Sequence, residues 1–234
     1  MQTLPFSLFR ALSWAIIIAM NVLRVIEKLD ELNNSGHEKE GEKHLEKWLE
    51  EARAEKDWKA ELTILGELLG QYRRTLNEEC GLQTADKVLK ILDEHNMRAT
   101  GSGATILINA ATTMKAFGKT NESIPLFEEA EQTYVACLNK DDYRFAPLYN
   151  NMALSFAEVG DIEKAEDYFY RALEHLERID NSECDRAVTY CNLAEMTENE
   201  NYLKKAAQCL KEAKKDAYYY FTLSKCKDIL GDLI

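Results

Sequence analysis

Three asparagines recur along the chain at a nearly constant spacing. Asn109 and Asn151 are 42 residues apart, and Asn151 and Asn192 are 41 residues apart. A carboxamide both donates and accepts hydrogen bonds, so it can pair with the peptide unit of a bound chain whatever that chain's side chains are. Gln71 occupies the equivalent place in an earlier, less regular stretch. Two interpretations remain open, because these amides could bind polypeptide or could instead bond neighbouring helices and only stabilise packing.

The sequence lacks the patterns expected of a catalytic site. Phe117-Gly-Lys-Thr120 ends like a phosphate-binding loop, but Thr113 stands where that loop requires its first glycine. The segment also joins two predicted helices rather than a strand and a helix. No Ser-His-Asp order or recurring carboxylate pair is present. We therefore expect a protein that is not an enzyme and that needs no cofactor.

The histidines and cysteines do not follow a metal-site pattern. We expect the histidines to face solvent in charged stretches; they are His37, His44, His95 and His175. His37 and His44 could share a helix face, but no third ligand converges on them. The cysteines lack a Cys-x-x-Cys pair; they are Cys80, Cys137, Cys184, Cys191, Cys209 and Cys226. Most lie on apolar helix faces, which indicates small buried hydrophobic residues in a reducing compartment, and we expect a cytoplasmic protein.

Composition narrows the fold class. The chain has 234 residues, of which 41 are acidic and 29 basic, for a formal net charge of −12. Its apolar fraction of 46% is too high for a disordered chain, and ten glycines and three prolines are few for a β-sandwich. The surplus of carboxylates repels a phosphate backbone, so nucleic acid is not an expected partner. These numbers favour a helix-rich, acidic protein.

Apolar residues repeat at the same spacing as the asparagines. Six positions recur in three copies: Leu107, Ala110, Ala111, Met114, Phe127 and Ala130; Tyr149, Met152, Ala153, Phe156, Phe169 and Ala172; and Tyr190, Leu193, Ala194, Thr197, Leu210 and Ala213. Each copy predicts two helices, and Gly118 and Gly160 mark the break between them in the first two. The small residues in each copy let the two helices approach closely.

These repeats organise most of the chain. We expect a repeat domain over residues 42–234, composed of a capping helix at 42–54, a loose repeat at 57–95, repeats at 104–138, 146–179 and 187–214, and a terminal helix at 216–230. Before it, residues 20–41 predict an amphipathic helix and a polar linker that covers 33–41. The terminal helix is aromatic and apolar, so we expect either that it meets a partner, which could be a second copy of this chain, or that the chain is shorter than its relatives.

The pattern resembles the tetratricopeptide repeat. The best unit contains Tyr149, Met152-Ala153, Phe156, Gly160, Ala165, Phe169 and Ala172. Ser123 replaces an alanine in the preceding unit, and Thr197 and Asn201 replace the aromatic residue and the turn glycine in the next. A period of 41 or 42 exceeds the usual period of about 34, and it is similar to the longer repeats of kinesin light chains and related bacterial proteins. The resemblance implies an all-α fold, a right-handed α-solenoid of antiparallel helix pairs.

The resemblance also implies a non-enzymatic module that binds a protein or peptide. In tetratricopeptide repeats the asparagine position faces a concave groove, where it commonly contacts the backbone of an extended peptide. The peptide-binding residues expected on this basis are Asn109, Asn150, Asn151, Asn192, Gln71, Thr112, Lys115, Leu154, Glu158 and Glu195. This acid-leaning set favours a neutral or basic ligand. The carboxylate clamp of chaperone-binding relatives needs several Lys or Arg residues on this face. It is not expected here, because Lys115 is the one basic residue in the predicted set.

Two alternatives remain open at this stage. The chain could be a peptide-sensing regulator, similar to the peptide receptors of Gram-positive bacteria, that acts through a separate effector. It could also be a membrane-tethered assembly factor, if the apolar residues 1–19 are a weak anchor. We favour a mis-assigned start or an extension for residues 1–19, then an anchor, and last a cleaved signal.

Overall fold

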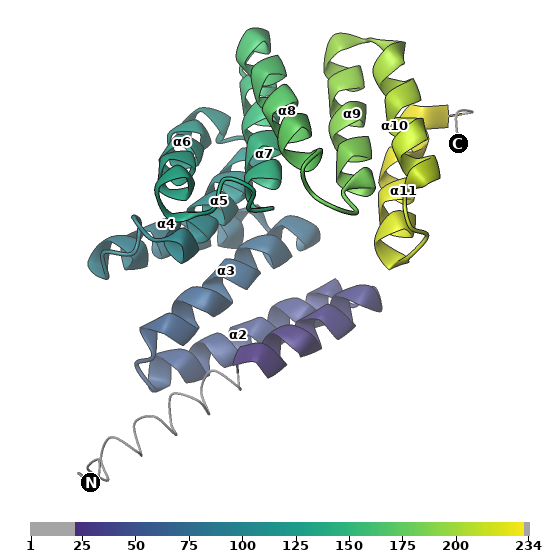
Figure 1. Cartoon of the computed structure of the whole chain (residues 1–234). Helices are drawn as coiled ribbons and strands as arrows, with labels where there is room; N and C mark the ends of the chain where they lie inside the picture. Colours follow the sequence, from purple (N-terminus) through teal and green to yellow (C-terminus); the bar gives the residue numbers. More distant parts are fainter. Residues whose placement is uncertain (1–21, 232–234) are drawn as a thin grey trace, which may run out of the picture. The chain divides into compact units, whose positions relative to one another are not determined.

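The computed structural model describes residues 22–231, and their regular elements are α-helices (Figure 1). A helical segment covers residues 22–34. It is followed by α2 (Glu38–Ala54), α3 (Trp58–Thr75), α4 (Glu78–Glu94), α5 (Gly101–Ala116), α6 (Thr120–Cys137), α7 (Phe145–Glu158), α8 (Ile162–Leu176), α9 (Glu183–Thr197), α10 (Glu200–Glu212) and α11 (Ala217–Leu230). The predicted extension at residues 1–19 lies outside the described residues.

The helices pack as consecutive antiparallel pairs, which confirms the predicted all-α repeat architecture. The chain divides into two compact units, with the boundary between Lys119 and Thr120. The first contains the segment 22–34 and α2 to α5, and the second contains α6 to α11. None of the helices in residues 22–231 is long and apolar enough to cross a bilayer.

Short polar side chains cap the starts of several helices, as at Asp57, Thr100 and Asp161. The Asp161 side chain accepts a hydrogen bond from the Lys164 amide at the start of α8 and so satisfies one of the free N–H groups there. Gly118 and Gly160 have φ angles of +75° and +84°, as expected for the predicted turns inside two repeats. In the third repeat the turn falls at Glu198, with φ +53°. Asn201 lies inside α10, so the prediction that it fills the turn position is wrong.

The predicted linker at 33–41 is also helical for most of its length. The segment 22–34 runs into it, and α2 begins at Glu38, so only residues 35–37 separate two helices. Val25 and Leu29 on one side and Leu45 and Leu49 on the other are buried. The predicted capping helix is therefore the second member of a first helix pair. The linker was predicted from the polar composition of residues 33–41. These helices nevertheless form, because their few apolar residues lie in one narrow stripe that is buried.

The repeated small and aromatic positions form the core. Ala111, Ala153 and Ala194 on the first helices, and Ala130 and Ala172 on the second, are almost inaccessible to solvent. Ser123, which departs from the repeat pattern, is fully buried as well and donates its hydroxyl to the carbonyl of Thr120. Within the second unit, the small side chains of Ala153 on α7 and Ala172 on α8 let these two helices approach closely.

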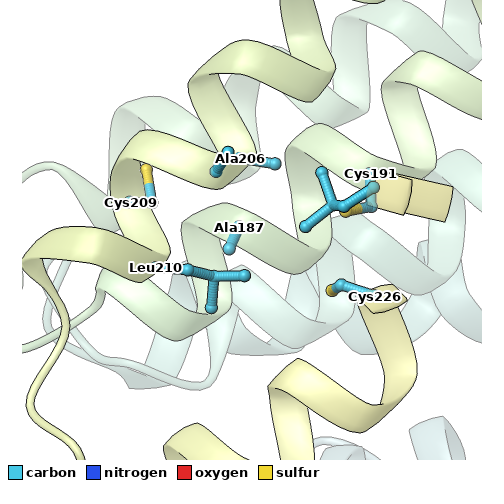
Figure 2. Close-up of a cluster of buried hydrophobic side chains, with 8 residues drawn as sticks. Ala187, Cys191, Ala206, Cys209, Leu210 and Cys226 are labelled. Atoms are coloured by element: carbon cyan, nitrogen blue, oxygen red, sulfur yellow. The ribbon is translucent and has the colours of Figure 1, made fainter. Parts of the chain in front are cut away.

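Four of the six cysteines are buried, and Cys137 is exposed. Figure 2 shows Cys191, Cys209 and Cys226 with Ala187, Ala206 and Leu210 in the apolar cluster that joins α9, α10 and α11. Burial raises the pKa of the Cys209 thiol, as expected for a small hydrophobic core residue. Most of the cysteines are thus buried, as predicted.

The solvent-facing environment predicted for the histidines is wrong for His175. Its ring is buried, and its Nε2 lies 2.8 Å from the carbonyl oxygen of Asp142. His44 and His95 are half-buried, and only His37 is exposed. The His175 ring can be buried between packed helices because the Asp142 carbonyl satisfies one of its ring nitrogens.

Candidate functional site

An open cavity of about 240 Å³ lies in the second unit, formed by α7, α9 and the start of α11. We call it the α7–α9 groove. It is lined by Tyr143, Ala146, Pro147, Asn150, Asn151, Leu154, Asp185, Val188, Asn192 and Tyr218. Four residues predicted from the sequence meet here: Asn150, Asn151, Leu154 and Asn192.

Helical spacing explains why these side chains share a surface. On α7, Tyr149, Met152 and Phe156 are buried. Pro147 and Leu154 lie two turns apart on another face of the helix, with Asn150 and Asn151 between them. On α9, Asp185, Val188 and Asn192 follow the same spacing of one to two turns. Two consecutive first helices therefore present matching stripes to the groove.

Asn150 bridges the two helices. Its Nδ2 donates to Thr189 Oγ1 of α9 at 2.8 Å, and its Oδ1 accepts from Asn192 Nδ2 at 3.5 Å. Thr189 is fully buried. Asn150 consequently contributes to the packing of α7 on α9, which is the alternative role considered for the asparagines.

Asn151 differs from its neighbour. Its Nδ2 donates to the Pro147 carbonyl of its own helix at 2.9 Å, and its Oδ1 receives no hydrogen bond from the residues described. The side chain is half-buried and lines the groove. Within the described part of the chain, the side chain of Asn192 makes one hydrogen bond, the long one to Asn150. Asn151 and Asn192 can thus accept hydrogen bonds from a ligand without losing a contact between helices.

One end of the groove carries a cluster that sequence reasoning missed. Tyr143 Oη and Tyr218 Oη both donate to Asp185 Oδ1, at 3.0 and 2.6 Å. Burial and the charge of Asp185 raise the pKa of Tyr143 to about 12 and also raise the pKa of Tyr218. Both phenols therefore keep their protons at neutral pH. The signal was present in the sequence, because Tyr143 and Asp185 are 42 residues apart, which is one repeat.

Two other predicted residues of the second unit lie outside this lining. Glu158 is exposed, and its Oε1 accepts a hydrogen bond from Thr120 Oγ1 at 2.7 Å, near the start of α6. Glu195 is exposed on α9.

The remaining predicted residues belong to the first unit. Thr112 donates to the Ile108 carbonyl of its own helix at 2.7 Å, and Asn109 and Lys115 are half-buried on α5. Gln71 is buried, and its amide donates to the Glu38 carbonyl of α2. The structure therefore places Gln71 in the packing between α2 and α3, away from solvent.

The groove offers amides, one carboxylate, two phenols and apolar side chains. This combination supports the recognition of a polar chain with apolar or charged side groups. In residues 22–231, no group of three His, Cys, Asp or Glu side chains is placed to hold a metal ion.

Consecutive antiparallel helix pairs, with a groove between successive first helices, define a helical-repeat protein. Residues 144–217 match the model of the tetratricopeptide repeat. This part of the chain is thus similar to tetratricopeptide repeats, and domains of this kind are generally protein-binding modules. The match begins just before α7 and ends at the first residue of α11, so it spans both helices of the groove.

Solved structures share the fold. BtubC (BKLC) from P. vanneervenii has 20% sequence identity and a TM-score of 0.70, over 92% of this chain and 85% of that one. A putative kinesin light chain from Podospora anserina with nearly identical TPR-like repeats has 14% identity and a TM-score of 0.65, over 88% and 97%.

A thermophilic TPR protein from Thermus thermophilus has 16% identity and a TM-score of 0.56, over 87% of this chain and 99% of that one. Comparison with curated protein sequences gives no significant match. The predicted resemblance to kinesin-light-chain-type and bacterial repeats is confirmed at the level of fold.

Proposed function

We propose that this chain is a non-enzymatic module whose α7–α9 groove binds an extended segment of a partner protein. The observation that carries the proposal is the free carbonyl oxygen of Asn151, which lines an open groove beside Pro147 and Leu154. A carbonyl that no helix uses is available to the N–H of an incoming chain.

The groove suits an extended peptide for a physical reason. An extended chain carries unpaired N–H and C=O groups along its length, and each one loses its water when it is bound. Asn151 and Asn192 replace some of those hydrogen bonds, while Pro147, Leu154 and Val188 offer apolar contact area. Because the amides pair with backbone, this part of the interaction tolerates many ligand sequences.

The proposal narrows the predicted set of residues. Asn150 and Gln71 use their amides in contacts between helices, so they are left out of the direct contacts with a ligand. Asn109 lies on α5 at the repeat position that corresponds to Asn151. Its contact with a bound peptide remains a prediction from the sequence. The alternatives of a peptide sensor with a separate effector and of a membrane-tethered assembly factor gain no specific support from the groove.

A selection experiment tests the proposal. The full chain is exposed to a displayed library of random peptides of about ten residues, long enough to run extended along one or two repeats. The affinity of a synthetic copy of the best peptide is then measured for the wild type, the double variant Asn151→Ala/Asn192→Ala and the control Asn201→Ala. Asn201 is an exposed asparagine on α10 and lines no part of the groove.

We expect the wild type and the Asn201→Ala control to bind the peptide with the same affinity. The double variant should bind it at least about tenfold more weakly. Failure to enrich any peptide would contradict the proposal. Equal binding by the double variant would show that peptides bind elsewhere.

A further inference from the structure

Within residues 22–231, no basic side chain forms an ion pair with the carboxylate of Asp185. It lies in the first turn of α9 and is half-buried. Tyr143 and Tyr218 both donate to Oδ1, while Oδ2 receives no hydrogen bond from residues 22–231. The adjacent basic residue, Arg186, pairs instead with Glu183 at 3.5 Å. One oxygen of Asp185 is therefore available to a ligand in the groove.

The charge of the groove is one-sided. Among the described residues that line it, Asp185 is the one carboxylate, and none is Lys, Arg or His. The whole chain has a formal net charge of −12, so the surrounding field also attracts cations. A charged group that enters this end of the groove is expected to be positive, because a second carboxylate would be repelled at short range.

The two phenols complete a site for a basic side chain. Tyr143 and Tyr218 are each 46% exposed, so their rings remain available beside the carboxylate. Aromatic faces attract guanidinium and ammonium groups, and the alkyl stem of such a side chain packs on apolar surface such as Val188. The carboxylate and the two rings thus all favour a guanidinium or an ammonium group.

The same unit already contains a filled example of this arrangement. The Arg171 guanidinium lies 4.3 Å from the centre of the Tyr149 ring and 4.7 Å from that of Tyr168, and it forms an ion pair with Glu131. Two tyrosines and one carboxylate therefore hold an arginine between α7 and α8. At Asp185 two tyrosines and a carboxylate occur again, without an arginine.

We infer that Asp185, Tyr143 and Tyr218 form a subsite for an arginine or lysine side chain of the bound segment. The inference rests on the proposed function and adds a sequence preference to it. Amides in the groove bind the ligand backbone, while the Asp185 subsite fixes its register. A planar guanidinium fits better than an ammonium, because it can stack on a ring while it donates to a carboxylate.

The peptide selection described above is repeated with Asp185→Asn and with the control Asp167→Asn. Asp167 is an exposed aspartate on α8 that lines no part of the groove. Both substitutions remove one negative charge. Wild type and Asp167→Asn should enrich peptides with arginine or lysine at one fixed position. Asp185→Asn should lose that preference, and the charge reversal Asp185→Arg should favour aspartate or glutamate there.

The first comparison of a second measurement uses only the wild-type chain. The best basic peptide is compared with a copy in which citrulline replaces the fixed arginine, which keeps its shape and removes its charge. Wild type should bind the citrulline peptide about tenfold more weakly, and Asp185→Asn should bind the two peptides alike, as a coupled pair requires.

The outcomes separate the inference from the proposed function. Peptides enriched through Asn151 and Asn192 without a fixed basic residue would overturn the subsite and leave the function intact. A basic preference that persists in Asp185→Asn would overturn the subsite as well. Failure to enrich any peptide would overturn both.

Discussion

Gln71 and Asn151 occupy corresponding repeat positions in the two units, yet their amides serve different purposes. Gln71 on α3 is buried and donates to the backbone of α2. Asn151 on α7 is half-buried and bonds only to its own helix. Repeat register therefore determines which face of a helix a residue occupies, whereas the neighbouring helix determines whether that face remains open.

Close packing of α2 accounts for the difference. A Cβ atom added to Gly41 would lie 3.1 Å from Gln71 Nε2 and 3.0 Å from Leu29 Cδ1. Because residue 41 is glycine, α2 approaches α3 closely enough to cover Gln71. Arg73 also crosses from α3 to α5, where it donates to Thr113 Oγ1 at 2.6 Å. Burial lowers the pKa of Arg73, as expected for a guanidinium held inside a contact between helices.

The largest expected effect is on the buried amide. Gln71→Ala removes a hydrogen bond and leaves a cavity, so it should lower the free energy of unfolding by about 2–3 kcal/mol. Urea unfolding of the full chain measures this change. Gln83→Ala on α4, where the glutamine is exposed and bonds to Glu79 in its own helix, is the control and should change stability little. A loss below about 0.5 kcal/mol for Gln71→Ala would contradict the packing role.

Asn151→Ala should impair binding rather than stability. Loss of this amide should weaken binding of the selected peptide about tenfold and should change the free energy of unfolding by less than about 0.5 kcal/mol. The small change in stability is expected because, within residues 22–231, the hydrogen bond of this side chain goes to its own helix. A loss of several kcal/mol of stability would show that Asn151 stabilises packing as Gln71 does.

Asn150→Ala should have an intermediate effect. It removes the hydrogen bond to the buried Thr189, so stability should fall by about 1 kcal/mol. A double-mutant cycle with Thr189→Val should show that the two residues are coupled. Additive losses would contradict a direct contact between α7 and α9 through these side chains.

The smallest expected effect concerns alkaline pH. The pKa of Tyr143 is raised to about 12, whereas a tyrosine in the unfolded chain ionises near pH 10. The unfolded state therefore loses this proton first, and the stability contributed by Tyr143 below about pH 10 is lost as the pH rises toward 12. Tyr143→Phe should make the decline in unfolding free energy over this range shallower. An unchanged slope would contradict the contact with Asp185.

Much of the fold could be predicted because repetition amplifies a weak helical signal. The predicted repeat at 146–179 corresponds to α7 and α8, and the terminal helix at 216–230 corresponds to α11 at Ala217–Leu230. The stretch 33–41 was missed because its apolar contacts are few. Its helical state depends on packing between the segment 22–34 and α2, which composition does not reveal.

The site was only partly predictable for a related reason. The repeat spacing correctly placed Asn151 and Asn192 in one groove. It could not tell Asn151 from Asn150, because the position of Thr189 on α9 decides which of the two amides bonds to that helix. Tyr218 was missed because it comes from the helix after the last repeat. Its contact with Asp185 depends on how α11 packs on α9.

Nuclear magnetic resonance of the side-chain amides tests the central claim most directly. The selected peptide is titrated into the ¹⁵N-labelled full chain, with resonances assigned from Asn151→Asp, Asn192→Asp and Gln71→Glu. The side-chain amide signals of Asn151 and Asn192 should shift progressively with peptide concentration, and that of Gln71 should stay in place. Shifts confined to Gln71 or to the second helices α8 and α10, with Asn151 unmoved, would contradict a peptide-binding α7–α9 groove.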